Sequence, residues 1–122
     1  MERIVAETPN AQLAAKDTAK WVVLRFVVGQ DAKAGELNAL VDALAELGKG
    51  TTKPMCLSFS GLPRPNSQIL AVLVNLLAAP DGSQRDVALV APSREWLDML
   101  DVIGVRANFT VVDSPAAIAG DA

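Results

Sequence analysis

Several residue types on which catalytic and metal sites depend are missing from this sequence. It contains no histidine and one cysteine. Without histidine the chain has no Ser–His–Asp or Cys–His catalytic group and no zinc site with an imidazole ligand. The one thiol, Cys56, has no partner for an internal disulfide. Its place in an apolar run predicts a small core residue rather than a reactive thiol.

Clustered positive charge is also missing. Eleven Lys and Arg residues oppose fourteen Asp and Glu residues, which gives a formal net charge of −3. A nucleic-acid interface needs a basic patch, and here the basic residues are scattered, apart from Lys49 and Lys53 near one turn. Residues 48–53 resemble a phosphate loop only superficially, because the glycine and Ser/Thr spacing of that motif is absent. We therefore expect no nucleic-acid partner.

No apolar run is long enough to span a membrane. The longest, residues 69–80, is interrupted by Asn75 and is shorter than the roughly 20 residues that a bilayer requires. The first residues mix charged and apolar side chains and do not resemble a signal peptide. The sequence therefore predicts a cytoplasmic protein that does not insert into a membrane.

The residues that are present predict one α/β domain over residues 1–122, since 51% of them are hydrophobic and the length suits a single core. Apolar or alternating runs predict strands at 21–28, 55–60, 86–91 and 109–113. We expect the first of these to be a central strand buried on both faces. Helical spacing predicts helices at 37–47, 67–78 and 93–103, and a short last helix after Ser114.

This alternation predicts a mainly parallel, mixed sheet of four or five strands with helices packed against it. The first 20 residues are harder to assign. Either 3–7 or 11–15 could add a strand in hairpin fashion, with a turn at Pro9-Asn10.

Details of the helices give further expectations. Gly48 is a natural residue to end the first helix, and Ser93 is a suitable N-cap for the third, with Ile103 facing inward. The helix at 69–77 is apolar almost all round. It is either fully covered by the core or leaves one face as a partner or dimer patch, so a homodimer is possible.

Four segments in order resemble the STAS domain, the fold of bacterial anti-sigma factor antagonists. Residues 24–47 resemble its strand, turn and first helix, and residues 57–62 resemble its Leu-Asp-Leu-Ser-Gly-Val strand. Residues 90–105 resemble its third helix, and residues 109–114 its last strand and cap. The resemblance implies a STAS-like single domain.

The family's functional motif is Asp-Ser-(Ser/Thr)-Gly-Leu, whose third residue is phosphorylated by a partner kinase. An ungapped count from Ser60 places it on residues 66–70, so that Gln68 occupies the acceptor position. A glutamine cannot be phosphorylated, and the resemblance therefore implies a protein without this switch. Shifting this alignment by one residue would make Ser67 the acceptor, but it spoils the match of the apolar positions that follow. The simpler interpretation of Ser67 is an N-cap of the helix.

The expected function is a non-catalytic regulatory protein-interaction domain without a cofactor or metal. We expect the partner to be an anti-sigma kinase-like regulator. One alternative is an accessory subunit on the ATPase of a membrane transporter. Another is a domain that binds a small anionic ligand or nucleotide at a helix N-terminus. The predicted partner-binding residues are Arg64, Pro65, Asn66, Ser67, Gln68 and Ile69.

Overall fold

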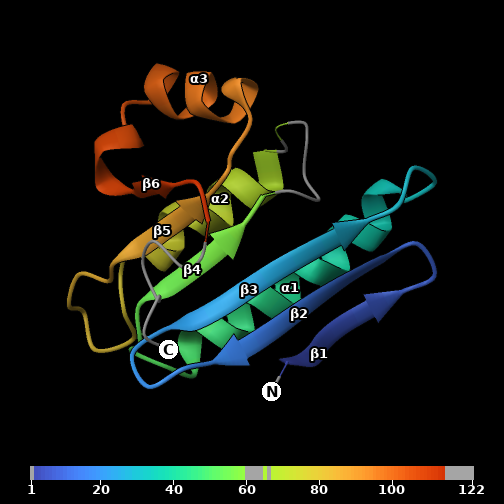
Figure 1. The fold of residues 1–122 in the computed structure, drawn as a ribbon, viewed down its shortest axis with the longest axis horizontal. Helices are drawn as coiled ribbons and strands as arrows, with labels where there is room; N and C mark the ends of the chain where they lie inside the picture. The colour runs from blue at the N-terminus through green and yellow to red at the C-terminus, as the bar shows by residue number, and fades with distance from the viewer. Residues whose placement is uncertain (1, 60–64, 66, 115–122) are drawn as a thin grey trace.

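A computed structural model of the chain describes residues 2–59, 65 and 67–114. They form a six-stranded mixed sheet in the sequential order β1-β2-β3-β4-β5-β6 (Figure 1). The first three strands are antiparallel, and β3 to β6 run parallel to one another. The bounds are β1 Glu2–Thr8, β2 Ala11–Asp17, β3 Val22–Val28, β4 Met55–Ser58, β5 Val87–Val90 and β6 Thr110–Val112.

The α/β prediction is confirmed, but the sheet has more strands than the four or five expected. Both candidate segments near the N-terminus are strands, β1 and β2, and residues 9 and 10 form the turn between them. The predicted last helix after Ser114 lies outside the described residues. The helices are α1 Ala34–Lys49, α2 Ser67–Leu76 and α3 Arg94–Val102, followed by a short 3-10 turn, η1 Arg106–Asn108.

Helices α1 and α2 pack behind the same face of the sheet, α1 behind β2 and β3 and α2 behind β4 and β5 (Figure 1). The prediction that β3 is buried on both faces was therefore wrong. Its side chains alternate: Leu24 and Phe26 point into the core, whereas Arg25 and Val27 are exposed on the other face. No helix of the described residues covers that face beside β3.

Gly48 does not end α1, as the sequence predicted. It lies inside the helix and is buried, and Gly50 is the C-cap. A Cβ atom on Gly48 would stand only 2.5 Å from Cδ2 of Leu76 on α2. The missing side chain therefore allows the two helices to approach closely rather than allowing the chain to turn.

Arg85, just before β5, is buried with a relative exposure of 2%. Its Nη2 donates to the carbonyl oxygens of Gly48 (2.8 Å) and Thr51 (2.6 Å) at the end of α1. Burial lowers the pKa of Arg85, and the charge of Asp81 opposes this shift. A cation at a helix C-terminus is favoured by the helix dipole, so Arg85 joins the β5 side of the sheet to the end of α1.

Glu36 in the first turn of α1 holds the β1–β2 turn. Its Oε1 accepts hydrogen bonds from Thr8 Oγ1 and from the backbone N–H of Asn10, both at 2.7 Å. Its Oε2 accepts from the backbone N–H of Lys33 at 2.9 Å. These bonds, with that from Thr8 as the largest cause, lower the pKa of Glu36 to about 2.

Helix α3 starts as predicted and ends differently. Ser93 Oγ accepts from the backbone N–H of Trp96 at 3.3 Å, which confirms Ser93 as the N-cap. Ile103 was expected to face inward, but it is 46% exposed. The helix stops at Val102, and Gly104 turns the chain with a φ of +80°, so Ile103 lies beyond the last helical turn.

Candidate functional site at the carboxyl ends of β4 and β5

The parallel strands β4 and β5 end side by side, and the next helices start at the same end of the sheet (Figure 1). Backbone hydrogen bonds between neighbouring strands continue one residue past the ends of β4 and β5. The backbone N–H of Phe59 donates to Val90 O at 3.0 Å, and that of Ala91 donates to Val112 O at 2.8 Å. Ligands and partners of open α/β sheets bind preferentially at the carboxyl ends of the strands, so this end is the candidate site.

The structure places four of the six predicted partner-binding residues. Ser67 and Gln68 form the first turn of α2 and are exposed, and Pro65 is half-buried. Arg64 and Asn66 lie outside the described residues. Ile69 is only 1% exposed and packs in the core, so it can support the site but offers no surface to a partner.

Ser67 is the first residue of α2. The position before it lies outside the described residues, so the capping of this helix is not described. Both interpretations of Ser67, as a cap and as a phosphate acceptor, therefore stay predictions.

Helix α2 carries no charged side chain along its whole length. The first backbone N–H groups of a helix give that end a partial positive charge, which an acidic residue in the first turn often offsets. No residue of α2 itself does so. The exposed end with Ser67 and Gln68 therefore favours contact with a negatively charged or hydrogen-bond-accepting group.

An aromatic pair forms the base of the site. Phe59, which follows β4, and Trp96, in the first turn of α3, pack edge to face with ring centroids 4.9 Å apart and an interplanar angle of 84°. Both rings are buried. Such pairs contribute about 0.5–1.5 kcal/mol beyond the area that they bury, so the start of α3 is fixed against the end of β4.

The turn between β5 and α3 holds a strained residue. Ala91 adopts a left-handed backbone conformation, with φ of 51°, which costs a residue with a Cβ roughly 1–2 kcal/mol. Nothing in the sequence signals this, because left-handed residues are usually glycine or asparagine. The conformation directs the chain from the end of β5 to the N-cap Ser93.

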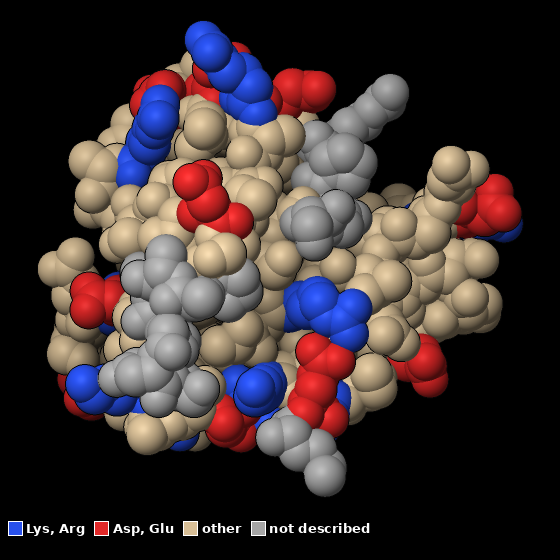
Figure 2. Space-filling view, in the orientation of Figure 1, with Lys and Arg blue, Asp and Glu red and all other residues tan. Residues whose placement is uncertain are grey.

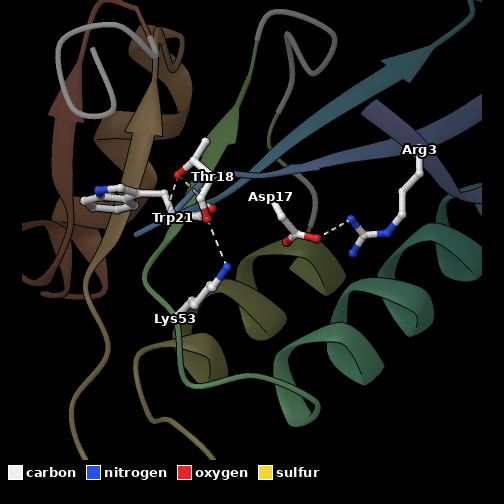
Figure 3. Close-up of polar contacts among 5 residues, drawn as sticks. All are labelled: Arg3, Asp17, Thr18, Trp21 and Lys53. Carbon is white, nitrogen blue, oxygen red and sulfur yellow. Dashed lines mark hydrogen bonds and ion pairs between the residues drawn. The ribbon is translucent and has the colours of Figure 1, made fainter. Parts of the chain in front are cut away.

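A polar cluster lies at the end of the sheet opposite to the candidate site (Figure 3). Arg3 Nη1 pairs with Asp17 Oδ2 at 2.6 Å, which joins β1 to β2. Lys53 Nζ donates to Thr18 O at 3.0 Å, and the Thr18 hydroxyl accepts from the backbone N–H of Trp21 at 2.9 Å. A hollow of about 420 Å³ lies beside Arg3, Asp17 and Lys53. These contacts join neighbouring segments of the chain, and we assign this cluster a structural role.

The described residues offer few reactive or metal-binding groups. Cys56 is buried, and burial raises the pKa of its thiol, which makes it a poor nucleophile. Residues 2–59, 65 and 67–114 contain no group of three or more metal-ligating side chains. Within the same residues, no helix has the length and apolar character needed to cross a bilayer.

Comparisons with known proteins agree with this architecture. No family model and no curated protein matches the chain. Among solved structures, a proposed anti-sigma factor antagonist from Thermotoga maritima superposes on it with a TM-score of 0.67. The match covers 88% of this chain and 91% of that chain. The fold is STAS-like. The two sequences are 20% identical, so the likeness concerns the fold, and the function must be argued from the site.

The predicted STAS-like fold is thus confirmed. The predicted position of this family's motif is residues 66–70. These residues follow β4 at the start of α2, where Ser67 and Gln68 are exposed to solvent. Phe59, Trp96 and Ala91 were missed by sequence reasoning as parts of this region.

Proposed function

We propose that this chain is a non-catalytic regulatory domain that binds a protein partner through the start of α2, in the manner of an anti-sigma factor antagonist. One observation carries the proposal. The fold is STAS-like, and Ser67 and Gln68 at the start of α2 are exposed and uncharged near the carboxyl ends of β4 and β5. A rigid sheet behind an exposed helix start is a suitable scaffold for docking.

We also propose that this domain is not regulated by phosphorylation of the motif at the start of α2. Phosphorylation adds about −1.5 to −2 charges, and at a helix N-terminus that charge creates new hydrogen bonds and repels acidic neighbours. Gln68, at the position of the acceptor, has an amide that cannot be phosphorylated. The domain would then remain in the state that the unphosphorylated family members adopt.

Gln68→Asp tests the docking site, because it adds a permanent negative charge to the exposed first turn of α2. The matched control is Asn75→Asp, an exposed residue near the other end of the same helix. Tagged wild-type and variant proteins would be expressed in the native cells, and the proteins that co-purify would be identified and quantified by mass spectrometry.

We expect Gln68→Asp to reduce recovery of the partner at least tenfold and Asn75→Asp to leave it unchanged, with both melting temperatures close to that of the wild type. An ATP-binding, anti-sigma kinase-like partner would support the proposal. Recovery of a membrane transporter's ATPase would favour the accessory-subunit alternative. Partner binding that is insensitive to Gln68→Asp would place the docking site elsewhere.

Intact-mass analysis of the same native protein, with peptide mapping over residues 54–85, tests the missing switch. We expect no phosphate under any growth condition. A phosphate on Ser67 would contradict the non-switched proposal and restore ordinary partner switching.

A small anionic ligand is a second candidate, because the uncharged N-terminus of α2 is suited to an anion. A ligand would raise the melting temperature of the isolated protein in proportion to its binding. A shift with phosphate or a nucleotide that Gln68→Asp abolishes would favour this candidate over a protein partner.

A further inference from the structure

The two faces of the sheet carry two separate groups of buried residues. All three helices contribute buried side chains to the larger group. The smaller group consists of Cys56, Ala88 and Val90, which alternate along β4 and β5 with residues of the larger group and therefore point to the opposite face. We call these three residues the open-face patch. Figure 1 shows this face towards the viewer, with α1 and α2 behind the sheet.

The open-face patch is buried although none of the three described helices packs on it. Cys56 and Ala88 have a relative exposure of 0%, and Val90 has one of 4%. On β3, at the same face, Arg25 and Val27 are exposed, as expected for a sheet face in contact with water. A covering layer therefore lies over β4 and β5 and leaves these two side chains of β3 uncovered. Figure 2, in the same orientation, shows no continuous layer of charge over the described part of this face.

Neighbouring side chains of the described residues do not account for this burial. Trp21, Val23 and Val112 pack against the patch, and each is itself partly buried. By the strand register, Trp21 is level with residue 54, whereas Val90 is level with residue 58. Four residues of a strand span roughly 13 Å, so one indole ring does not cover both ends of the patch. The burial arises within a single chain, so the missing cover belongs to this chain.

Residues 115–122 are well placed to cover the patch. Strand β6 pairs with β5, and the described residues end two positions after it, at Ser114. Strand β4 is two strand spacings from β6, about 10 Å, whereas eight extended residues reach about 26 Å. Residues 60–64 have less freedom, because they must lead from β4 to α2 on the other face. The segment after Ser114 has one acidic and no basic residue, and its apolar core is Ala116, Ala117, Ile118 and Ala119.

We propose that residues 115–122 form a strap that crosses β5 and covers the open-face patch, with Ile118 as the main apolar contact. Small side chains in the strap suit the shallow floor formed by Ala88 and Cys56. A tethered segment also has a high effective concentration at its site, so a small apolar contact is enough to hold it. The strap completes a second, smaller core and shields the thiol of Cys56. It is independent of the proposed docking site at the start of α2.

Thiol labelling tests the strap, because Cys56 is the one cysteine of the sequence. The full chain, a chain that ends at Ser114 and Ile118→Asp would be labelled with a small thiol reagent under native conditions. We expect the shortened chain and Ile118→Asp to react at least tenfold faster than the full chain. The matched control is Val102→Asp, at a position of α3 that is 85% exposed, and it should react at the rate of the full chain.

A second control separates release of the strap from global unfolding. Leu100→Ala lowers stability within the larger core and leaves the open face untouched. With free energies of unfolding measured in urea, the two strap variants should still label faster than Leu100→Ala when their stability is no lower. Equal labelling rates in the full chain, the shortened chain and Ile118→Asp overturn the proposal. So does a thiol in the full chain that is protected only at high protein concentration, since a second copy would then cover the patch.

Disulfide trapping tests the same contact without shortening the chain. Ala117→Cys, Ile118→Cys and Ala119→Cys would be oxidised one at a time, and peptide mapping would identify the bonds formed. A disulfide requires the two Cα atoms to lie within about 7 Å, so at least one of the three should form a disulfide with Cys56. Val102→Cys is the control and should form none. If none of the three strap positions forms a disulfide with Cys56, the strap does not cross the patch and the proposal is overturned.

Discussion

Gly48→Ala tests how closely α1 and α2 approach. The added Cβ would stand 2.5 Å from Leu76 Cδ2 and 3.3 Å from Arg85 Nη1, whereas carbon atoms in contact prefer about 3.5–4.0 Å. Leu76 is buried, so its side chain would have to shift to admit the new atom. Overpacking of this kind costs about 1–3 kcal/mol. Alanine also favours the helix by about 0.5–1 kcal/mol, so the expected net loss is up to about 2.5 kcal/mol.

Gly35→Ala, in the first turn of the same helix, separates these two contributions. A Cβ at Gly35 would meet no atom within 4 Å, so this variant should gain the helical preference alone. Urea unfolding followed by circular dichroism measures both variants. The difference between their free energies of unfolding estimates the packing cost, and we expect about 1–3 kcal/mol.

The Leu76→Ala background provides the decisive comparison. It removes the Cδ2 atom that the new Cβ would meet, so Gly48→Ala should become neutral or stabilising there. Coupling between contacting residues of this kind is typically about 0.5–3 kcal/mol. If Gly48→Ala and Gly35→Ala have equal effects in the wild-type background, the close approach of the two helices is refuted.

Two further predictions concern the polar contacts around α1. Arg85→Met fills a similar space but has no hydrogen-bond donor, so the carbonyl oxygens of Gly48 and Thr51 lose the bonds from Arg85. Urea unfolding should show that the free energy of unfolding falls by about 1–3 kcal/mol. An unchanged stability would contradict the role given to Arg85. Glu36 has a folded pKa of about 2, below its ordinary 4.5, so its contribution is present above pH 4.5 and is lost as the pH falls towards 2. Calorimetry should therefore find Glu36→Gln less thermostable than the wild type at neutral pH and equal to it near pH 2; a difference that persists at low pH would exclude this carboxylate as the cause.

The order of helices and strands after residue 20 could be predicted because hydrophobic periodicity is a local signal. Strands β1 and β2 were less clear for a physical reason. Residues 11–15 contain three alanines, which have a low preference for strands, and the segment becomes a strand by pairing with β3. The number of strands therefore depended on tertiary pairing that the local sequence does not encode.

Gly48 and Arg85 show the limit of sequence patterns more sharply. A glycine near the end of an amphipathic run usually ends the helix, and an arginine in a polar loop is usually exposed. Here both are buried at one junction, where α1, α2 and the segment before β5 meet. Only the three-dimensional neighbours explain why glycine and arginine occur at these positions.

At the candidate site, the turn composition predicted the exposed start of α2 correctly for Ser67 and Gln68, whereas Ile69 belongs to the core. The pairing of Phe59 with Trp96 joins residues 37 positions apart and has no sequence signature. The left-handed Ala91 also depends on its surroundings, because its neighbours must offset the strain.

These features fit the proposed absence of a switch. A phosphate-driven switch works by adding a large charge at a helix N-terminus, where the backbone dipole and any nearby charges respond to it. Helix α2 has no charged side chain, and Gln68 offers only a neutral amide. Within α2 itself, the backbone would then be the main source of electrostatic potential at this surface. Under this proposal the surface recognises its partner by shape and hydrogen bonds, and phosphorylation at position 68 is not available to release the partner. Regulation of a domain of this kind would have to act on the partner, or on the number of copies that reach it.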